Sequence, residues 1–111
     1  MELARARVSE ESVVVSITGK IDIQTSPELK SEVLDIANAD IKSILLDFSG
    51  VTFINSSGLG GLINLLKEVK KQDAKLAIVN PSSFIVNLFK LTQLDKVFSI
   101  YNNIEEALEQ E

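Results

Sequence analysis

The chain has 111 residues, 45% of them hydrophobic, and a formal net charge of −5, so we expect a single domain over residues 1–111 with one core. The acidic balance, with no run of Lys or Arg, argues against nucleic acid or an anionic membrane as a partner. The absence of Cys and His excludes disulfides and thiolate nucleophiles and argues against triad hydrolysis and most zinc or iron chemistry. We therefore expect no catalytic residues, no cofactor and no metal.

The N-terminus lacks an apolar segment long enough for a signal peptide, and no segment approaches the length of a membrane span. These features predict a cytoplasmic protein. A small domain with a single core can be monomeric, and we expect a monomer.

The first part of the chain predicts two strands. Residues 3–8 alternate weakly in polarity and predict an edge strand. The β-branched run Val13–Ile17 predicts a second strand, which we expect to end at Gly19. A short extended passage, Lys20–Ile23, is expected to follow.

A helix is predicted to follow, with two possible starts. Either Thr25 caps the helix and Glu28 returns the bond, or Ser26 caps it with Pro27 in the first helical position. We expect the helix to end at Ala39-Asp40. Its apolar face is formed by Leu29, Val33, Ile36 and Ala37.

The central stretch, residues 47–61, predicts a strand end, a short loop and a helix N-terminus. The buried strand Ile44–Leu46 precedes it. Asn55, Ser56 and Ser57 lie where a helix cap is needed, because each side-chain oxygen can accept from an unpaired backbone N–H. Two hydroxyls are thereby placed at the positive end of a helix dipole, as a structural cap or as a phosphorylation site. The helix has apolar residues at helical spacing: Leu59, Leu62, Ile63, Leu66 and Val69.

The last part of the chain predicts two strands and two helices. Leu76–Val79 is a short buried strand, and either Ser82 or Ser83 caps the helix that follows. Residues 97–101 predict a last strand, and Asn103-x-x-Glu106 is a capping box for a short C-terminal helix. We interpret three phenylalanines of this part as core residues: Phe84, Phe89 and Phe98.

The order of these elements predicts an α/β fold with a mixed sheet of four to five strands and about four helices. Gly58, Gly60 and Gly61 open a helix after a strand, so a phosphate-cradling loop has to be considered. A dinucleotide fingerprint would have a third glycine where this chain has Ile63, and the Gly-Lys-Ser/Thr ending of a P-loop is absent. Close packing of the helix on the sheet explains the glycines better.

Two aspartates follow strands. From its spacing alone, Asp22 is a turn or local cap residue, and Asp47 ends the third predicted strand, where it could accept from loop N–H groups.

Two motifs resemble those of STAS domains, and in particular those of the small anti-sigma factor antagonists of bacteria. One is Gly19-Lys20-Ile21-Asp22 followed by Thr25 and Leu29, and the other is the stretch from Leu46 to Gly60. Leu91-Thr92-Gln93-Leu94 before the last strand also fits, so the resemblance covers nearly the whole chain.

The resemblance implies a switch component rather than an enzyme. Family members bind an anti-sigma factor, a serine kinase of the histidine-kinase-like ATPase type, and so release a sigma factor. The kinase phosphorylates the antagonist on a serine that corresponds to Ser56, and a serine phosphatase reverses this. We expect the partner to contact the surface formed by Asp22, Thr25, Asn55, Ser57 and Gly58.

The chain departs from the family at one position. The family usually has aspartate before the regulatory serine, where this chain has Asn55, which caps a helix as well but carries no charge. This residue motivates an alternative, a non-phosphorylated STAS scaffold or ligand-sensing module in a larger assembly. A third possibility, a small nucleotide-binding or catalytic protein, is disfavoured by the absent His and the incomplete glycine motif.

Overall fold

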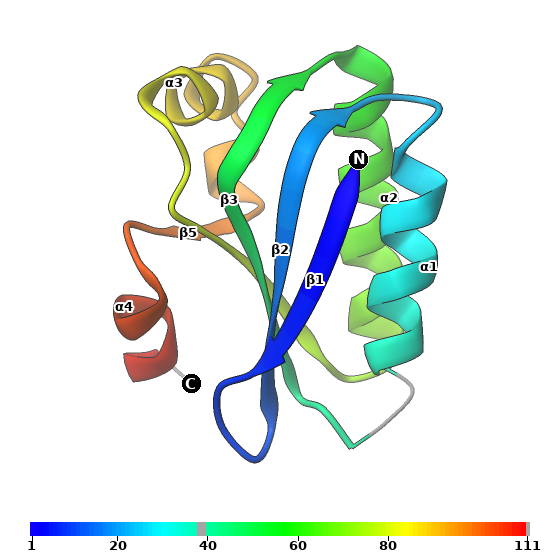
Figure 1. Cartoon of the computed structure of the whole chain (residues 1–111). Coiled ribbons are helices and arrows are strands. Elements are labelled where there is room, and N and C mark those ends of the chain that lie inside the picture. Colours follow the sequence, from blue (N-terminus) through cyan, green and yellow to red (C-terminus); the bar gives the residue numbers. More distant parts are fainter. Residues whose placement is uncertain (38–39, 111) are drawn as a thin grey trace.

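The computed structural model describes residues 1–37 and 40–110, which form one five-stranded sheet flanked by helices (Figure 1). The strands lie in the order β1-β2-β3-β4-β5, with β1 antiparallel to β2 and all other neighbours parallel. The predicted α/β fold with a mixed sheet is confirmed. The elements in chain order are β1 (Glu2–Arg7), β2 (Ser12–Ile21), α1 (Ser26–Ala37), β3 (Ser43–Ile54), α2 (Ser56–Lys71), β4 (Lys75–Val79), α3 (Ser83–Leu91), the 3₁₀ helix η1 (Leu94–Lys96), β5 (Ser99–Tyr101) and α4 (Ile104–Glu109).

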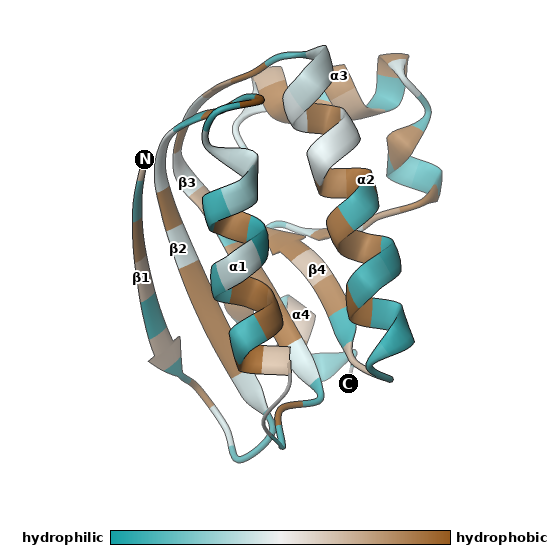
Figure 2. Cartoon of the chain, turned by 90° about the vertical axis from the view of Figure 1, so that its right-hand side faces the viewer, coloured by the Kyte–Doolittle hydropathy of each residue, from teal (hydrophilic) through white to brown (hydrophobic). Residues whose placement is uncertain are grey.

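The helices cover the two faces of the sheet unequally. Helices α1 and α2 lie against one face, and their hydrophobic sides turn toward the strands (Figure 2). The larger core cluster lies between them and the sheet, whereas α4 covers a smaller apolar cluster on the opposite face. Helix α3 lies at the end of the sheet where β3 leads into α2 (Figure 1). The carboxyl ends of the parallel strands therefore face the same end of the molecule as the α2 N-terminus.

Strand β2 does not end at Gly19, as the sequence suggested, but runs on to Ile21. Gly19 has a φ of 113°, and the register of β2 with β3 shifts on either side of it. This is a bulge: the glycine adopts a backbone conformation that side chains disfavour, and the strand continues past it. The prediction that the strand ends at Gly19 is wrong, because this glycine forms a bulge within the strand.

Strand β3 is also longer than predicted. It continues from Ser43 to Ile54, so the expected loop shrinks to the single residue Asn55 before α2 begins. Val51 and Ile54 are buried, and Ile54 pairs with Ile21. The added apolar contacts explain why the strand extends.

At three of the four helix starts, the side chain of a predicted capping residue makes the capping bond. Ser82, rather than Ser83, caps α3 by accepting from Ile85 N–H at 3.3 Å. Asn103 caps α4 by accepting from Glu106 N–H at 2.8 Å, and Asn55 caps α2. Helix α1 begins at Ser26, so Thr25 occupies the N-cap position, and its backbone carbonyl accepts from Leu29 N–H at 3.2 Å. The Thr25 hydroxyl, however, bonds within the preceding turn. The predicted end of α1 includes Ala39, which lies outside the described residues.

The interpretation of the three phenylalanines as core is wrong for one of them. Phe89 and Phe98 are buried and meet edge to face, with ring centroids 5.5 Å apart and an interplanar angle of 62°. Phe84 is 59% exposed. It immediately precedes the buried Ile85, so it lies on a different side of α3 from the residues that face the core.

These two environments on one helix predict different effects of the same substitution. Phe89→Ala should lower the free energy of unfolding by about 3–5 kcal/mol, because it removes a buried ring and leaves a cavity. Phe84→Ala should change it by less than about 1 kcal/mol, since most of that ring is already in solvent. Urea unfolding of both variants checks this, and equal losses would contradict the assigned core.

Candidate functional site

The N-terminus of α2 presents two serines to solvent. Asn55 is the N-cap, with φ −101° and ψ −179°, and its side-chain oxygen accepts from Gly58 N–H at 2.8 Å. Its carbonyl accepts from Leu59 N–H at 2.9 Å. Ser56 and Ser57 occupy the first two helical positions, and both are exposed. Because Asn55 does the capping, neither hydroxyl is needed as a cap.

The electrostatics of this helix end favour an anion. Helix α2 is 16 residues long and has no acidic residue in its first turn. The unpaired N–H groups there carry partial positive charge, which stabilises a negative group within the first turn. A phosphate on Ser56 would therefore lie at a favourable place in the fold.

The second part of the site is the turn between β2 and α1. Asp22 Oδ1 accepts from Gln24 N–H at 2.9 Å and from Thr25 N–H at 3.0 Å. The Thr25 hydroxyl accepts from Asp22 N–H at 3.0 Å and donates to the Lys20 carbonyl at 2.8 Å. The Thr25 hydroxyl also donates to Asp22 Oδ1, at 3.2 Å. The bonds that this carboxylate accepts, above all the one from the Thr25 backbone, lower the pKa of Asp22, and nearby Lys20 adds to the shift. Asp22 is thus a turn residue that holds a carboxylate in a fixed place.

Gly58 joins the two parts. A Cβ on Gly58 would overlap the Ile21 carbonyl, reach 2.7 Å from its carbon and 3.2 Å from Asp22 N. The first turn of α2 therefore rests directly on the peptide that starts the Asp22 turn. Asn55 N–H also donates to the Ile21 carbonyl, at 3.4 Å. The structure thereby brings Asp22, Thr25, Asn55, Ser56 and Ser57 to one corner of the molecule. Gly58, which we expected in the contact surface, is instead buried beneath them against the Ile21 peptide.

The other two glycines of α2 have different surroundings. A Cβ on Gly61 would lie 2.7 Å from both Cβ and Oγ of Ser26, so this glycine permits close packing of α2 on α1. Gly60 has nothing within 4 Å of such a Cβ. The packing explanation of the glycine motif thus applies to Gly58 and Gly61, although Gly61 faces a helix rather than the sheet.

Asp47 lies apart from this surface. It is inside β3 rather than at its end, because the strand continues to Ile54. Its Oδ1 accepts from Ser49 N–H at 3.0 Å and from the Asn80 side chain at 3.2 Å. Asp47 therefore braces β3 against the residue that follows β4, and the prediction that it satisfies local backbone donors is confirmed for Ser49.

Apolar neighbours of the site are a feature that the sequence analysis missed. Ile23 in the Asp22 turn is 71% exposed, and Phe53 near the end of β3 is 43% exposed. The alternation of β3 gave a signal for Phe53, since it precedes the buried Ile54.

Two searches of the described residues bear on other functions. Within residues 1–37 and 40–110, no three His, Cys, Asp or Glu side chains are grouped so that they could hold a metal ion. In the same part of the chain, no helix is both long and apolar enough to cross a membrane.

The fold and the site described above are those of a small α/β domain, and comparison with known proteins gives its family. The STAS domain model matches residues 4–107, so the chain belongs to the STAS domain family. The chain is 33% identical over 94 residues to the anti-sigma-B factor antagonist of Bacillus subtilis, covering 83% of this chain and 84% of that protein.

Solved structures agree with this assignment. The crystal structure of TM1081 from Thermotoga maritima has a TM-score of 0.84 and 28% identity, covering 97% of this chain and 92% of that one. The Bacillus cell fate determinant SpoIIAA in its phosphorylated form has a TM-score of 0.71 and 20% identity, with 98% of each chain covered. At that identity, the second likeness shows the shared fold alone.

The contact at Gly58 predicts opposite effects of alanine at two glycines of the same helix. Gly58→Ala should destabilise the domain by about 1–3 kcal/mol, because the added methyl group has to displace the Ile21 peptide. Gly60→Ala should stabilise it by about 0.5–1 kcal/mol, because its Cβ meets open space and alanine favours the helix. Urea unfolding of the pair checks this, and a Gly58→Ala variant as stable as wild type would contradict the packing.

The hydrogen bonds of Asp22 predict a pH dependence of stability. Its folded pKa lies below the ordinary value of 3.8, so the ionised carboxylate stabilises the fold above that pH. This contribution is lost as the pH falls through the lowered pKa of the folded state. Asp22→Asn keeps an oxygen acceptor but cannot ionise, so the stability difference between wild type and variant should shrink with acidification. Thermal unfolding from neutral to strongly acidic pH measures it, and a constant difference would contradict the account.

Proposed function

We propose that this chain is an anti-sigma factor antagonist that acts in the bacterial cytoplasm as a binding switch and not as an enzyme. It binds an anti-sigma factor serine kinase and so releases a sigma factor, until the kinase phosphorylates Ser56 and binding weakens. A serine phosphatase restores the active form. The observation that carries this proposal is the exposed Ser56 on a capped helix N-terminus that packs against the turn holding the Asp22 carboxylate.

The function of one relative and the fold of another support the proposal. The Bacillus subtilis protein, at 33% identity, is an anti-sigma-B factor antagonist, and SpoIIAA has the same fold in its phosphorylated form. By analogy, we expect a phosphate on Ser56 to be compatible with this fold.

The effect of the phosphate falls on the interface. Phosphorylation adds about 1.5 to 2 negative charges at neutral pH, which the helix N-terminus tolerates. A partner that covers Ser56 has to desolvate this group next to the Asp22 carboxylate, which costs far more than covering a hydroxyl. Affinity is therefore lost while the fold persists.

Asn55 is compatible with this switch. Its oxygen fills the same capping role that an aspartate would, through the 2.8 Å bond from Gly58 N–H. Because the amide is neutral, a phosphate on Ser56 has one negative neighbour fewer than with aspartate at this position. The chain therefore keeps the cap and loses only the charge that a kinase could recognise.

The missing charge also motivates the second candidate, a STAS scaffold or ligand-sensing module that is not phosphorylated. The two functions differ in their response to Ser56→Asp. A switch should lose its kinase partner with this variant, whereas a scaffold should keep its partners.

The proposal predicts covalent modification at one residue. Incubation with ATP and the anti-sigma factor serine kinases of the source organism should add the mass of one phosphate, and Ser56→Ala should abolish the increase. Ser57→Ala is the matched control, because that serine is also exposed in the first turn of α2, and it should still be phosphorylated. Intact-mass spectrometry measures all three proteins, and a phosphate that persists in Ser56→Ala would contradict the assignment.

A further inference from the structure

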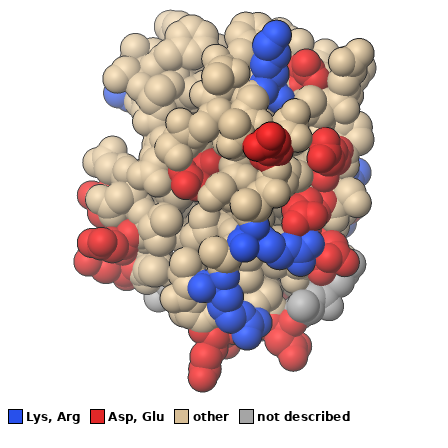
Figure 3. Space-filling model, in the orientation of Figure 1, with Lys and Arg blue, Asp and Glu red and all other residues tan. Residues whose placement is uncertain are grey.

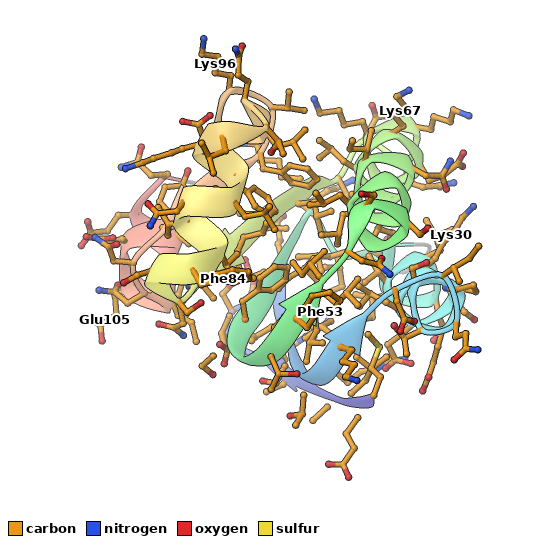
Figure 4. The ribbon with its side chains drawn as sticks, turned by 90° about the horizontal axis from the view of Figure 1, so that it is seen from above. Lys30, Phe53, Lys67, Phe84, Lys96 and Glu105 are labelled. Carbon is orange, nitrogen blue, oxygen red and sulfur yellow. The ribbon has the colours of Figure 1, made fainter. Side chains whose placement is uncertain are left out.

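Two aromatic side chains lie exposed at the end of the molecule that carries Ser56. Of the five phenylalanines, Phe48, Phe89 and Phe98 are buried, whereas Phe53 is 43% and Phe84 59% exposed. Seen from above in Figure 4, these two residues lie at neighbouring places, Phe53 near the end of β3 and Phe84 on the first turn of α3.

Phe53 is fixed close to the serine by the backbone. It is three residues before Ser56, a separation of about 10 Å at most along an extended chain. It pairs in register with Lys20, at the start of the Asp22 turn. The exposed Ile23 lies in that turn, so apolar groups border the serine on both the β2 and the β3 sides.

The surface around α3, which carries Phe84, is poor in charge, whereas Phe53 has Lys20 as its neighbour on β2. Figure 3 shows that the part of this face over α3 is mostly uncharged, whereas a basic and an acidic side chain lie at its upper edge and further charged groups gather lower down and at the sides. Exposed aromatic residues with few charges around them are typical of the centre of a protein interface rather than of its rim.

A kinase that binds at Ser56 has to cover more surface than the helix end alone provides. A stable complex covers about 800 Å² on each partner. The whole chain exposes 6153 Å², so a kinase seated on Ser56 has to cover roughly one eighth of that surface. The small polar helix end cannot supply this area alone, and the adjoining surface at the same end includes Phe53 and Phe84.

We infer that Phe53 and Phe84, together with Ile23, form an apolar docking surface for the same serine kinase that phosphorylates Ser56. This inference rests on the proposed function. The docking surface supplies the affinity, and Ser56 supplies the control, since a phosphate there opposes a contact that the aromatic residues favour. Aromatic side chains that become fully covered are the ones that contribute most to such interfaces.

The test compares Phe53→Thr and Phe84→Gln with Leu91→Gln. Leu91 is the matched control, because it is an apolar residue of the same helix α3, 84% exposed, at the end opposite to Phe84. Titration calorimetry with the anti-sigma factor kinase should show about tenfold weaker binding for each Phe variant and less than about twofold change for Leu91→Gln. Unchanged thermal midpoints verify that all three variants fold.

Phosphorylation kinetics distinguishes weaker kinase binding from a disturbed position of Ser56. The KM for phosphorylation should rise in both Phe variants while kcat stays near wild type, because Ser56 and its cap are untouched. Wild-type affinity in both Phe variants, or an equal loss in Leu91→Gln, overturns the docking surface and leaves the proposed function standing. A wild-type chain that neither binds nor is phosphorylated by any such kinase overturns both.

Discussion

The site depends on the close approach of α2 to the end of β2. Gly58 has no side chain, so the first turn of the helix rests on the peptide between Ile21 and Asp22, where a methyl group would not fit. Asn55 adds a second tie, since its N–H donates to the Ile21 carbonyl while its side chain caps the helix. These contacts join a strand end, a turn and a helix start into one rigid corner, which explains why residues more than thirty positions apart form a single surface.

In this corner, the residues that stabilise the fold differ from the residue proposed to control binding. Hydrogen bonds within the corner shape it: backbone N–H groups hold the Asp22 carboxylate, and Asn55 supplies the helix cap. Ser56 is therefore exposed and free to be modified at little cost to the fold, since the helix dipole tolerates the added charge. In the proposed switch, the same charge acts fully on a partner, which has to cover it beside a second negative group.

The sequence predicted most of the fold because its signals were local. Strand runs, helix periodicity and the caps at Asn55 and Asn103 depend on neighbours within a turn, and the structure confirms them. The failures depended on contacts distant in sequence. Gly19 is typical of a strand end unless its pairing with β3 is known, and Phe84 is typical of a core residue unless the side of α3 that faces the sheet is known. That Asp22 lies near Ser56 could be predicted only from the family resemblance. The packing at Gly58 that explains it produces no periodic pattern in the sequence.

The central claim is that a phosphate on Ser56 changes the interface and not the fold. The most direct measurement is the dissociation constant for the anti-sigma factor kinase of unmodified protein and of protein phosphorylated on Ser56, determined by titration calorimetry under the same conditions. The account predicts clearly weaker binding for the phosphorylated protein, by at least about tenfold, a difference of about 1.4 kcal/mol in binding free energy. Equal dissociation constants for the two forms would contradict it.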